Sequence, residues 1–347
     1  MLPRPPIPLP EPLAEWDFDL PPELIAQEPP PDRDGGRLLV VGERLEDRNI
    51  RDLPALLRAD DLLVFNDVKV RRARLAARRA TGGAVEVLVL RATGTEAEVL
   101  VKPARKIREG ERLLAGPGEI ELLAHMDEGR ARVRFHPDLE SIEAAVGSIP
   151  LPPYMARPAT AADEDRYQTL FAREGALRAA AAPTAGLHFS PTLLAQLDTM
   201  GVERVPVSLE VGLGTFRPLT EVQVAKGELH PERFDVPEST WAAVERAQRA
   251  GRRVVAVGTT SVRVLESATG PGPGETRIFL REGWVPRRVG ALFTNFHLPR
   301  SSLLMLVAAF AGRPRVLAAY AHAVAQRYRF FSYGDACFFP APRPDVG

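Results

Sequence analysis

Residues 253–261 read Arg253-Val254-Val255-Ala256-Val257-Gly258-Thr259-Thr260-Ser261, and this stretch decides the fold. Residues 254–257 are apolar and mostly β-branched, which is typical of a strand buried on both faces. The glycine and three hydroxyl residues then break the strand, and a helix is expected over residues 262–268. A buried strand that turns at once into a helix predicts an α/β domain, with a mainly parallel sheet between two layers of helices.

The same alternation of strands and helices recurs on both sides of this stretch. Ser301 and Ser302 precede an apolar run, and serine favours the start of a helix because its hydroxyl accepts a free backbone amide. Gly251 follows another helical run, and glycine commonly ends a helix. The predicted strands are 37–41, 62–65, 204–209, 253–257 and 278–280, and the predicted helices are 240–250 (capped by Ser239 or Thr240), 262–268, 303–310 and a last one ending near Arg327.

Between Asn66 and Ser148 the chain changes character, with short, partly alternating apolar runs separated by Gly, Asp or Glu. These runs are residues 85–90, 98–101, 120–123 and 130–135, and no helical pattern interrupts them before about Leu139. Short alternating strands at this spacing predict a small antiparallel barrel. We therefore expect a discontinuous α/β domain (residues 1–66 and 150–347) and an inserted β-barrel (residues 67–149), with the proline-stiffened connector 149–154 between them.

The composition restricts the class of protein. Of 347 residues, 45% are hydrophobic, yet no apolar run approaches the roughly 20 residues of a membrane span. Cys337 is the only cysteine, which excludes disulfides within the chain and cysteine-rich metal sites. The formal net charge is zero, which argues against a general nucleic-acid coat but not against a local basic face. The first residues lack a secretion signal, so we expect a cytoplasmic protein with no membrane partner.

A second stretch, Ala181-Ala182-Pro183-Thr184-Ala185-Gly186-Leu187-His188-Phe189-Ser190, combines small apolar residues with one imidazole. Pro183 and Gly186 mark a loop, and Ser190-Pro191 then begins a helix. His188 therefore lies on a loop that leads into a helix N-terminus, where free amides favour the binding of anionic groups. This position makes His188 a candidate site residue. A lone histidine is more often a packed side chain, and from this stretch alone that interpretation stays open.

Tyr328–Asp335 is a further turn, with an acid at its end. Three other loops follow strands or precede a helix: Glu210–Phe216, Gly258–Ser261 and Thr294–Pro299. Ligands of open α/β sheets bind beyond the carboxyl ends of the strands, so we expect these loops on one side of the sheet. Arg263 and Glu266, three residues apart, can pair on one helix face. The sequence has no metal-ligand spacing of histidines and carboxylates and no G-x-S-x-G. The residues alone thus indicate an α/β enzyme with a polar site and no metal.

Several blocks, in order along nearly the whole chain, resemble the S-adenosylmethionine:tRNA ribosyltransferase-isomerase family of queuosine biosynthesis. The most specific is Ala-Ala-Pro-Thr-Ala-Gly-Leu-His-Phe at residues 181–189. The others are residues 18–27, 66–67, 101–106, 150–154, 165–169, 257–263, 294–299 and 328–336. The resemblance implies an α/β sandwich with an inserted β-barrel, in agreement with the division into domains made above.

The resemblance also implies an unusual reaction. The ribosyl group of S-adenosylmethionine is transferred and isomerised onto 7-aminomethyl-7-deazaguanine at the wobble position of tRNA, giving epoxyqueuosine-tRNA, adenine and methionine. S-adenosylmethionine is then a consumed co-substrate, tRNA is the macromolecular partner, no cofactor is needed and a monomer is favoured. Val68, Lys69, Glu210 and Gly227 differ from the family pattern. Two alternatives therefore remain: a different transfer from S-adenosylmethionine, or tRNA binding without catalysis.

This chemistry needs a base for the carbon next to the sulfonium and a donor that helps adenine to leave. His188 is the first candidate for the base, His297 the second, and Glu210 a third. Asp335 or Glu266 could accept from ribose hydroxyls or the methionine ammonium, and Arg263, beside the amides of Thr259 and Thr260, could hold the methionine carboxylate. The expected substrate contacts are Asn66, Asp67, Tyr154, Thr184, Gly186, Gly212, Gly214, Thr215, Thr259, Thr260, Arg263, Glu266 and Asn295.

Two basic runs are candidates for binding tRNA: Lys69, Arg71, Arg72 and Arg74, and then Lys102, Arg105 and Lys106. Phosphate neutralisation supplies much of the affinity for nucleic acid, so a neutral protein must concentrate its cations where RNA docks. The first run has no Asp or Glu before Thr81, which favours an unpaired basic face. The alternative is a solvated face whose cations pair with nearby acids.

Overall fold

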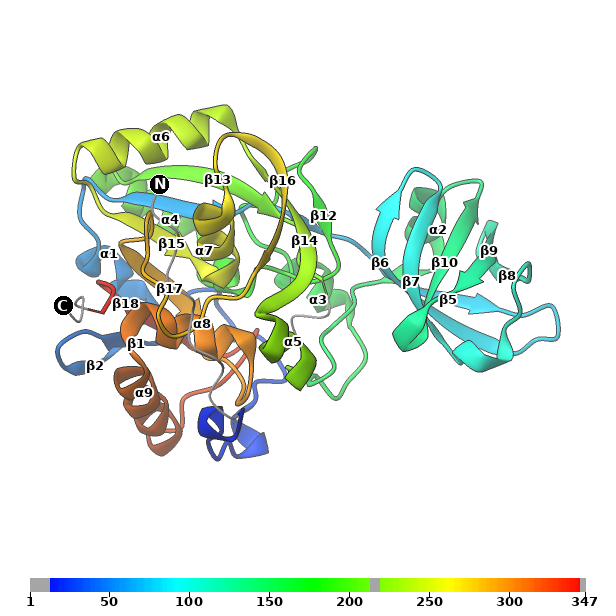
Figure 1. The fold of residues 1–347 in the computed structure, drawn as a ribbon, viewed down its shortest axis with the longest axis horizontal. Coiled ribbons are helices and arrows are strands. Elements are labelled where there is room, and N and C mark those ends of the chain that lie inside the picture. Colours follow the sequence, from blue (N-terminus) through cyan, green and yellow to red (C-terminus); the bar gives the residue numbers. More distant parts are fainter. Residues whose placement is uncertain (1–12, 213–218, 344–347) are drawn as a thin grey trace.

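The structure is a computed structural model that describes residues 13–212 and 219–343. Most of them form an α/β domain around a nine-stranded sheet, and a smaller barrel stands to one side (Figure 1). The strand order in the large sheet is β16-β14-β13-β3-β15-β17-β18-β1-β2. The strands are β1 (Arg37–Val41), β2 (Leu45–Asn49), β3 (Leu62–Asn66), β13 (Glu203–Leu209), β14 (Glu228–Val236), β15 (Val254–Val257), β16 (Gly272–Ile278), β17 (Ala291–Asn295) and β18 (Ala336–Phe339).

The centre of this sheet is parallel. β13, β3, β15 and β17 run in one direction, with Leu62 opposite both Glu203 and Val254. β18 and β1 are also parallel to each other, whereas the pairings of β2, β14 and β16 and that between β17 and β18 are antiparallel. The predicted α/β class is confirmed, and the sheet is a mixed one with its parallel part in the middle.

Helices cover both faces of the sheet. Successive residues of a strand point to opposite sides, so one strand contributes side chains to two cores. Leu62 and Val64 belong to the core beneath α6 (Glu238–Arg249), α7 (Gly258–Ser267), α8 (Ser302–Ala311) and α9 (Arg313–Ala325). Leu63 belongs to the opposite core, beneath α1 (Leu53–Leu56) and α4 (Pro191–Met200). The smaller elements are α3 (Ala161–Arg166), α5 (Glu221–Lys226), η1 (Leu13–Trp16), η2 (Pro22–Leu24), η3 (Ile50–Asp52) and η6 (Thr184–His188).

The barrel is antiparallel, as predicted. Its sheet has the order β11-β5-β6-β7-β10-β9-β8, and a pairing of Arg78 with Leu114 joins β5 to β8 and closes it. Alternate residues such as Val87, Val99 and Val133 fill its core. The elements are β5 (Arg74–Arg78), β6 (Ala84–Thr93), β7 (Glu96–Lys102), η4 (Ala104–Lys106), β8 (Arg112–Ala115), β9 (Gly118–His125), η5 (Asp127–Gly129), β10 (Arg130–His136), α2 (Leu139–Val146) and β11 (Gly147–Ser148).

The chain enters and leaves the barrel through neighbouring segments. β4 (Lys69–Val70), within the predicted insert, pairs with β12 (Arg178–Ala179), and the barrel begins with β5. On the return, Gly147 and Ser148 pair with β5. A Cβ atom at Gly147 would lie 2.5 Å from the carbonyl oxygens of Arg72 and Glu143, so only glycine fits where the two connections pass each other.

Some boundaries differ from the sequence predictions. α7 begins at Gly258 and not at Val262, so the expected turn is the first helical turn. Pro237, and not Ser239 or Thr240, precedes α6, and the hydroxyl of Thr240 donates to the carbonyl of Pro206. β16 ends at Ile278, where a strand was expected to begin. The predicted caps of α4 and α8 are confirmed: Ser190 and Ser301 accept the amides of Leu193 and Leu304.

Within the described residues, no single helix is long and apolar enough to cross a membrane. α8 and α9 pass a test of length and composition only when taken together, and they are bent by 118° at their junction. Residues Leu304–Ala311 of α8 are buried in the core of the α/β domain, which accounts for the apolar character of this pair.

Candidate active site

A cleft opens where the carboxyl ends of β15 and β17 meet η6. β15 ends at Val257, and Gly258 (φ +84°) turns the chain into α7. β17 ends at Asn295, beside the 3-10 turn that carries Thr184. The cleft is lined by Ala182, Pro183, Thr184, Ala185, Val211, Gly258, Thr259, Thr260, Thr294, Asn295, Phe296, His297, Leu303, Phe331 and Ser332. Its position at the strand ends is the one expected for a ligand site in an α/β sheet.

Asn295 lies at the centre of a hydrogen-bond network in the cleft. Its Nδ2 donates to Nε2 of His188 at 2.9 Å and to the carbonyl of Phe331 at 3.0 Å. Its Oδ1 accepts from the hydroxyl of Thr184 at 3.1 Å. The side chain therefore ties together three segments that are far apart in the sequence.

These contacts also fix the state of His188. Phe331 offers a carbonyl and Thr184 a hydroxyl, so the amide of Asn295 is oriented with its nitrogen toward the imidazole. Nε2 of His188 is then an acceptor, and a neutral ring must carry its proton on Nδ1. Burial, and secondly the charge of Arg329, lower the pKa of His188 to about 3. His188 does not line the cleft but lies behind Asn295, so the structure favours a supporting place for it.

His297 lines the cleft directly. Its backbone amide donates to the hydroxyl of Tyr320 at 3.0 Å, and its ring nitrogens lie 3.3 Å from that hydroxyl and 3.4 Å from the hydroxyl of Thr294. Burial lowers the pKa of His297 to about 3. The ring is therefore neutral at pH 7, and both of its nitrogens lie beside protein hydroxyls.

The first turn of α7 supplies hydroxyls and free amides to the cleft. Thr259 and Thr260 both line it, as expected from the sequence. The buried hydroxyl of Thr260 has no hydrogen-bond partner within residues 13–212 and 219–343. A Cβ atom at Gly258 would approach that of Ala185 to 3.3 Å, and its φ disfavours other residues. These features bring the backbone of α7 close to η6 and leave polar groups available to a ligand.

Arg263 lies one turn further along α7 and does not pair with Glu266, as the spacing had suggested. Its Nη1 binds the carboxylate of Glu232 on β14, and Glu232 also accepts the amide of Gly212 at 3.2 Å. Nε and Nη2 of Arg263 are buried and have no hydrogen-bond partner among the described residues. Arg263 does not itself line the cleft, but a buried guanidinium with unused donors is an unusual arrangement that an anionic ligand would complete.

Two acids proposed for the site serve the fold instead. One oxygen of Asp335 accepts the amide of Arg37 and the other that of Arg329, at 2.8 and 2.7 Å. The carboxylate of Glu266 accepts the amides of residues 287–289. Both side chains are buried, and neither lines the cleft. Sequence position could not reveal this, because the amides that bind them come from distant segments.

Glu210, Asn66 and Asp67 also lie outside the cleft lining. Glu210 forms an ion pair of 2.7 Å with Arg233, which explains how a carboxylate is tolerated there. Asn66 exchanges hydrogen bonds with the backbone of Leu209. Asp67 binds Arg173 at 2.9 Å and the hydroxyl of Ser208 at 2.5 Å. Asn66 and Asp67 thus hold the end of β3 against its neighbours, and Glu210 links the end of β13 to β14.

The remaining predicted contacts are structural or lie elsewhere. A Cβ atom at Gly186 would meet Thr169 Cγ2 at 2.9 Å, so this glycine serves packing. The amide of Gly212 is used by Glu232, and Gly214 and Thr215 lie outside the described residues. Tyr154 reaches the site indirectly: its hydroxyl binds Ser332, and its ring centre lies 4.1 Å from that of Phe331.

Phe331 and Ser332 are cleft residues that sequence reasoning did not single out. Phe331 has a φ of +74°, which is uncommon for a bulky residue. Its backbone amide donates to Phe296 and its carbonyl accepts from Asn295, so two bonds hold the strained conformation. The signals for them were the predicted turn Tyr328–Asp335, which contains both residues, and the resemblance of the block 328–336 to the family.

The first basic run is largely paired with acids, contrary to the sequence argument. Arg71 and Glu143 form a buried pair at 2.7 Å, so Arg71 has no surface for phosphate. The other pairs are more exposed: Lys69 with Glu174, Arg72 with Glu164 and Arg74 with Glu86. The acids lie between residues 86 and 174, outside the window of residues 69–81 on which the sequence argument was based. Lys102 and Lys106, in contrast, are exposed and have no ion pair among the described residues.

No group of three or more histidines, cysteines and carboxylates in the described part of the chain could hold a metal ion. The cleft has a volume of about 40 Å³, which is room for a few water molecules. Only a small part of a substrate therefore enters it in this conformation. Its chemistry rests on an imidazole, a carboxamide, hydroxyls and helix amides.

An α/β sandwich with an inserted barrel, and a cleft of this composition at its strand ends, define the class: an α/β enzyme with a barrel insertion. The family model described as "Queuosine biosynthesis protein" matches residues 13–339, and the chain belongs to that family. The S-adenosylmethionine:tRNA ribosyltransferase-isomerase of Thiobacillus denitrificans is 48% identical over 94% of this chain and 96% of its own length. The enzyme of that name from Thermus thermophilus is 49% identical, covering 94% and 99%.

The solved structures include a similar chain. A crystal structure of S-adenosylmethionine tRNA ribosyltransferase from Thermotoga maritima has 36% sequence identity and a TM-score of 0.54. The match covers 94% of this chain and 99% of the other. The relatives' names denote a transferase-isomerase, which confirms the prediction of an enzyme of this family.

Proposed function

We propose that the protein transfers and isomerises the ribosyl group of S-adenosylmethionine onto 7-aminomethyl-7-deazaguanine at the wobble position of tRNA. The products would be epoxyqueuosine-tRNA, adenine and methionine, with S-adenosylmethionine consumed as a co-substrate. The observation that carries the proposal is the 48% identity over 94% of the chain to an S-adenosylmethionine:tRNA ribosyltransferase-isomerase. The cleft supports it, because its groups match what the reaction needs.

The first need is a proton acceptor for the carbon next to the sulfonium. We assign this role to His297, because it lines the cleft, its ring is neutral at pH 7 and, within the described residues, its Nε2 has only the long 3.4 Å contact with the hydroxyl of Thr294. His188 was the first candidate from the sequence. Its Nε2 already accepts from Asn295, and it lies behind the lining residues. We assign it the role of orienting Asn295, which lines the cleft.

The second need is to hold the charged end of the donor. The free amides at the N-terminus of α7 favour an anion, and Thr260 adds a hydroxyl without a partner in the described residues. Arg263 lies three residues beyond Thr260, on the same face of α7. Its unused Nε and Nη2 would be satisfied by the methionine carboxylate. The small, mostly apolar cleft would keep water from the reactive intermediate.

Adenine release measures this function directly. The protein would be mixed with S-adenosylmethionine and either tRNA carrying 7-aminomethyl-7-deazaguanine or the same tRNA with guanine at that position. We expect stoichiometric adenine and methionine only with the first. Binding of the tRNA without adenine release would identify a non-catalytic protein, and consumption of S-adenosylmethionine without adenine would identify another transfer.

Paired histidine variants test the assignment of roles. His297→Gln should lower kcat for adenine release by roughly 10²–10⁴-fold, the usual contribution of a general base. His188→Gln can still offer an amide oxygen to Asn295, so it should retain more activity than His297→Gln. The reverse order would return the role of the base to His188. Unfolding of each variant by urea serves as the control for folding.

A further inference from the structure

We infer that a second cleft, between the barrel and the connector (taken from here on as residues 149–159, with the five residues after Tyr154 included), binds an unpaired nucleotide next to the modified one in the tRNA. This hinge cleft has a volume of about 910 Å³, within the range of nucleotide-sized ligand sites. The inference rests on the proposed function, which supplies the RNA. Beyond that function, the inference specifies where the neighbour of the reacting nucleotide binds and which side chains hold it.

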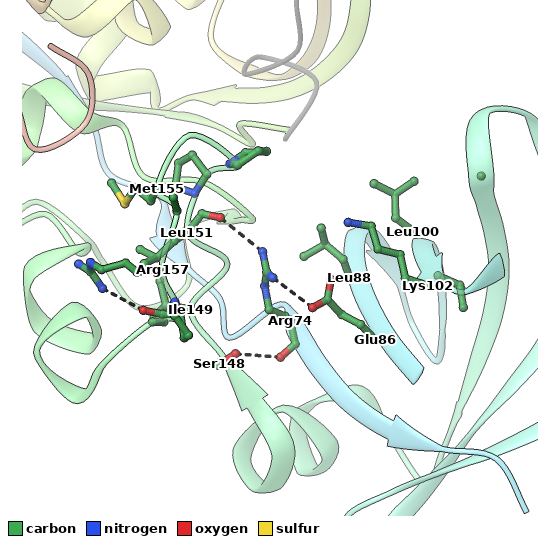
Figure 2. A pocket seen from close by; sticks show the side chains of 17 residues that line it. Arg74, Glu86, Leu88, Leu100, Lys102, Ser148, Ile149, Leu151, Met155 and Arg157 are labelled. Atoms are coloured by element: carbon green, nitrogen blue, oxygen red, sulfur yellow. Dashed lines mark hydrogen bonds and ion pairs between the residues drawn. The ribbon is translucent and has the colours of Figure 1, made fainter. Parts of the chain in front are cut away.

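The walls of the hinge cleft come from both domains (Figure 2). Arg74, Leu88, Leu100 and Lys102 line it from β5, β6 and β7 of the barrel. The opposite wall is the proline-rich connector, including Ile149, Leu151, Pro152, Pro153 and Met155. Figure 2 shows Arg74 between the connector on one side and Leu88 and Glu86 on the other. A ligand in this space would therefore touch both domains at once.

The charges of the hinge cleft suit a phosphate group. Lys102 is exposed and has no ion pair among the described residues, although it lies opposite Glu86 in the β6–β7 ladder. Glu86 is instead engaged by Nη1 of Arg74 at 3.1 Å. Nε of Arg74 is buried and has no partner in residues 13–212 and 219–343. Arg157 is held by Asp163 at 2.7 Å and the charge of Arg74 is balanced by Glu86, so the net positive charge of the lining comes from Lys102.

The rest of the lining suits a nucleobase. Leu88, Leu100 and Met155 offer apolar surface, and the guanidinium of Arg74 offers a planar cation. Unstacked bases of single-stranded RNA are commonly held against such groups, with the backbone phosphates on nearby lysines. Glu86, Ser148 and Arg157 of the lining are bonded to other protein groups, so the described lining offers no rigid set of free donors and acceptors for one particular base. The cleft therefore fits an unpaired nucleotide with little preference for its identity.

The position of the hinge cleft connects it to the active-site cleft. Pro153 and Met155 line the hinge cleft, while Tyr154 between them binds Ser332 of the active-site lining. The two clefts thus lie on either side of one short segment of the connector. The wobble nucleotide lies in an unpaired loop, so its neighbour is free to occupy such a second site.

The test combines protein variants with removal of a base from the RNA. Leu100→Asp places a carboxylate in the hinge cleft. Leu114→Asp makes the same change at a leucine of the same barrel that is 54% exposed and does not line it. The probe is an anticodon stem-loop, intact or with the base removed at either neighbour of the wobble position. Its Kd is measured by fluorescence anisotropy, and thermal unfolding shows whether each barrel is intact.

We expect Leu100→Asp to weaken binding of the stem-loop by roughly five- to hundredfold, the range of one lost base contact. Leu114→Asp should leave it unchanged. Removing the base at one neighbouring position should weaken the wild type by a similar factor and have no further effect in Leu100→Asp, because both changes remove the same contact. Lys102→Ala should reduce the slope of log Kd against log salt by about 0.7, the value for one phosphate on a single strand.

Equal affinities of Leu100→Asp and Leu114→Asp would overturn the inference, as would additive effects of base removal and Leu100→Asp. Adenine release by the wild type, measured in parallel, separates the two proposals. If the wild type releases adenine and Leu100→Asp binds the stem-loop with unchanged affinity, only the inference about the hinge cleft is rejected. A wild type that binds the stem-loop but releases no adenine rejects the proposed function, and the affinities still decide the cleft.

Discussion

Replacing Asn295 by aspartate changes one group, the amide nitrogen, at the centre of the hydrogen-bond network in the active-site cleft. The amide nitrogen that donates to Nε2 of His188 at 2.9 Å becomes an oxygen that can only accept. The imidazole must then move its proton to Nε2 or acquire a second one. The wild type should show a neutral His188 with its proton on Nδ1, and Asn295→Asp should show a proton on Nε2.

The size of the effect follows from the separation of the groups. Two opposite unit charges 2.9 Å apart, at an effective dielectric constant of roughly 20, attract by roughly 6 kcal/mol. That energy would raise the pKa of His188 from about 3 to roughly 7. The lost bond to the carbonyl of Phe331 should also lower the free energy of unfolding by about 1–3 kcal/mol, because two oxygens then face each other.

Nitrogen-15 NMR of histidine-labelled protein distinguishes the two neutral forms from the charged ring, and His188→Gln assigns the signal. The matched control is Asn49→Asp, an exposed residue before η3 where aspartate serves equally well as a cap. Titration of wild-type His188 near pH 6.5, or an unchanged signal in Asn295→Asp, would refute the hydrogen-bond pattern on which its supporting role depends.

Two further predictions concern stability and RNA binding. The folded-state pKa values of His188 and His297, both about 3, lie below the ordinary value near 6.5, so the unfolded chain binds more protons between these values. The free energy of unfolding should fall as pH drops from 6.5, by up to roughly 1.4 kcal/mol per pH unit per ring, and urea titrations of wild type and His297→Gln would show it. Arg71→Ala leaves the buried Glu143 with only its 4.0 Å pair to Arg178 among the described residues and should cost up to about 3–5 kcal/mol, without changing the salt dependence of tRNA binding; a changed slope would indicate that Arg71 contacts the RNA.

Buried parallel strands were the most predictable part of the fold. β1, β3 and β15 are almost entirely apolar because both of their faces are covered, and a run of this kind has few other interpretations. β2 was missed because its sequence, Leu-Glu-Asp-Arg-Asn, has one apolar residue, and it forms only by pairing with β1 at the sheet edge. The first turn of α7 was missed because Gly, Thr and Ser are poor helix formers, and its burial against the sheet overrides their preference.

Within the site, the sequence predicted which loops meet but not what each side chain binds. Asn295, Thr184, Thr259, Thr260 and His297 line one cleft, because loops at the ends of adjacent parallel strands must converge. Asp335 and Glu266 were misplaced because their partners are backbone amides, which every residue except proline carries and which no residue type reveals. The pairing of the basic run was missed for a related reason, since its acids lie up to about a hundred residues away in the chain.

The crossing at Gly147 has a consequence for how the protein can change over time. The strand that begins the barrel and the one that ends it are hydrogen-bonded neighbours, so the two ends of the insert already lie together. A folded unit with adjoining ends can be shortened, lengthened or exchanged for another without pulling apart the halves of the chain that flank it. Chain connectivity therefore permits another inserted domain in place of the barrel. The carbonyl oxygens around Gly147 restrict how any replacement could be joined.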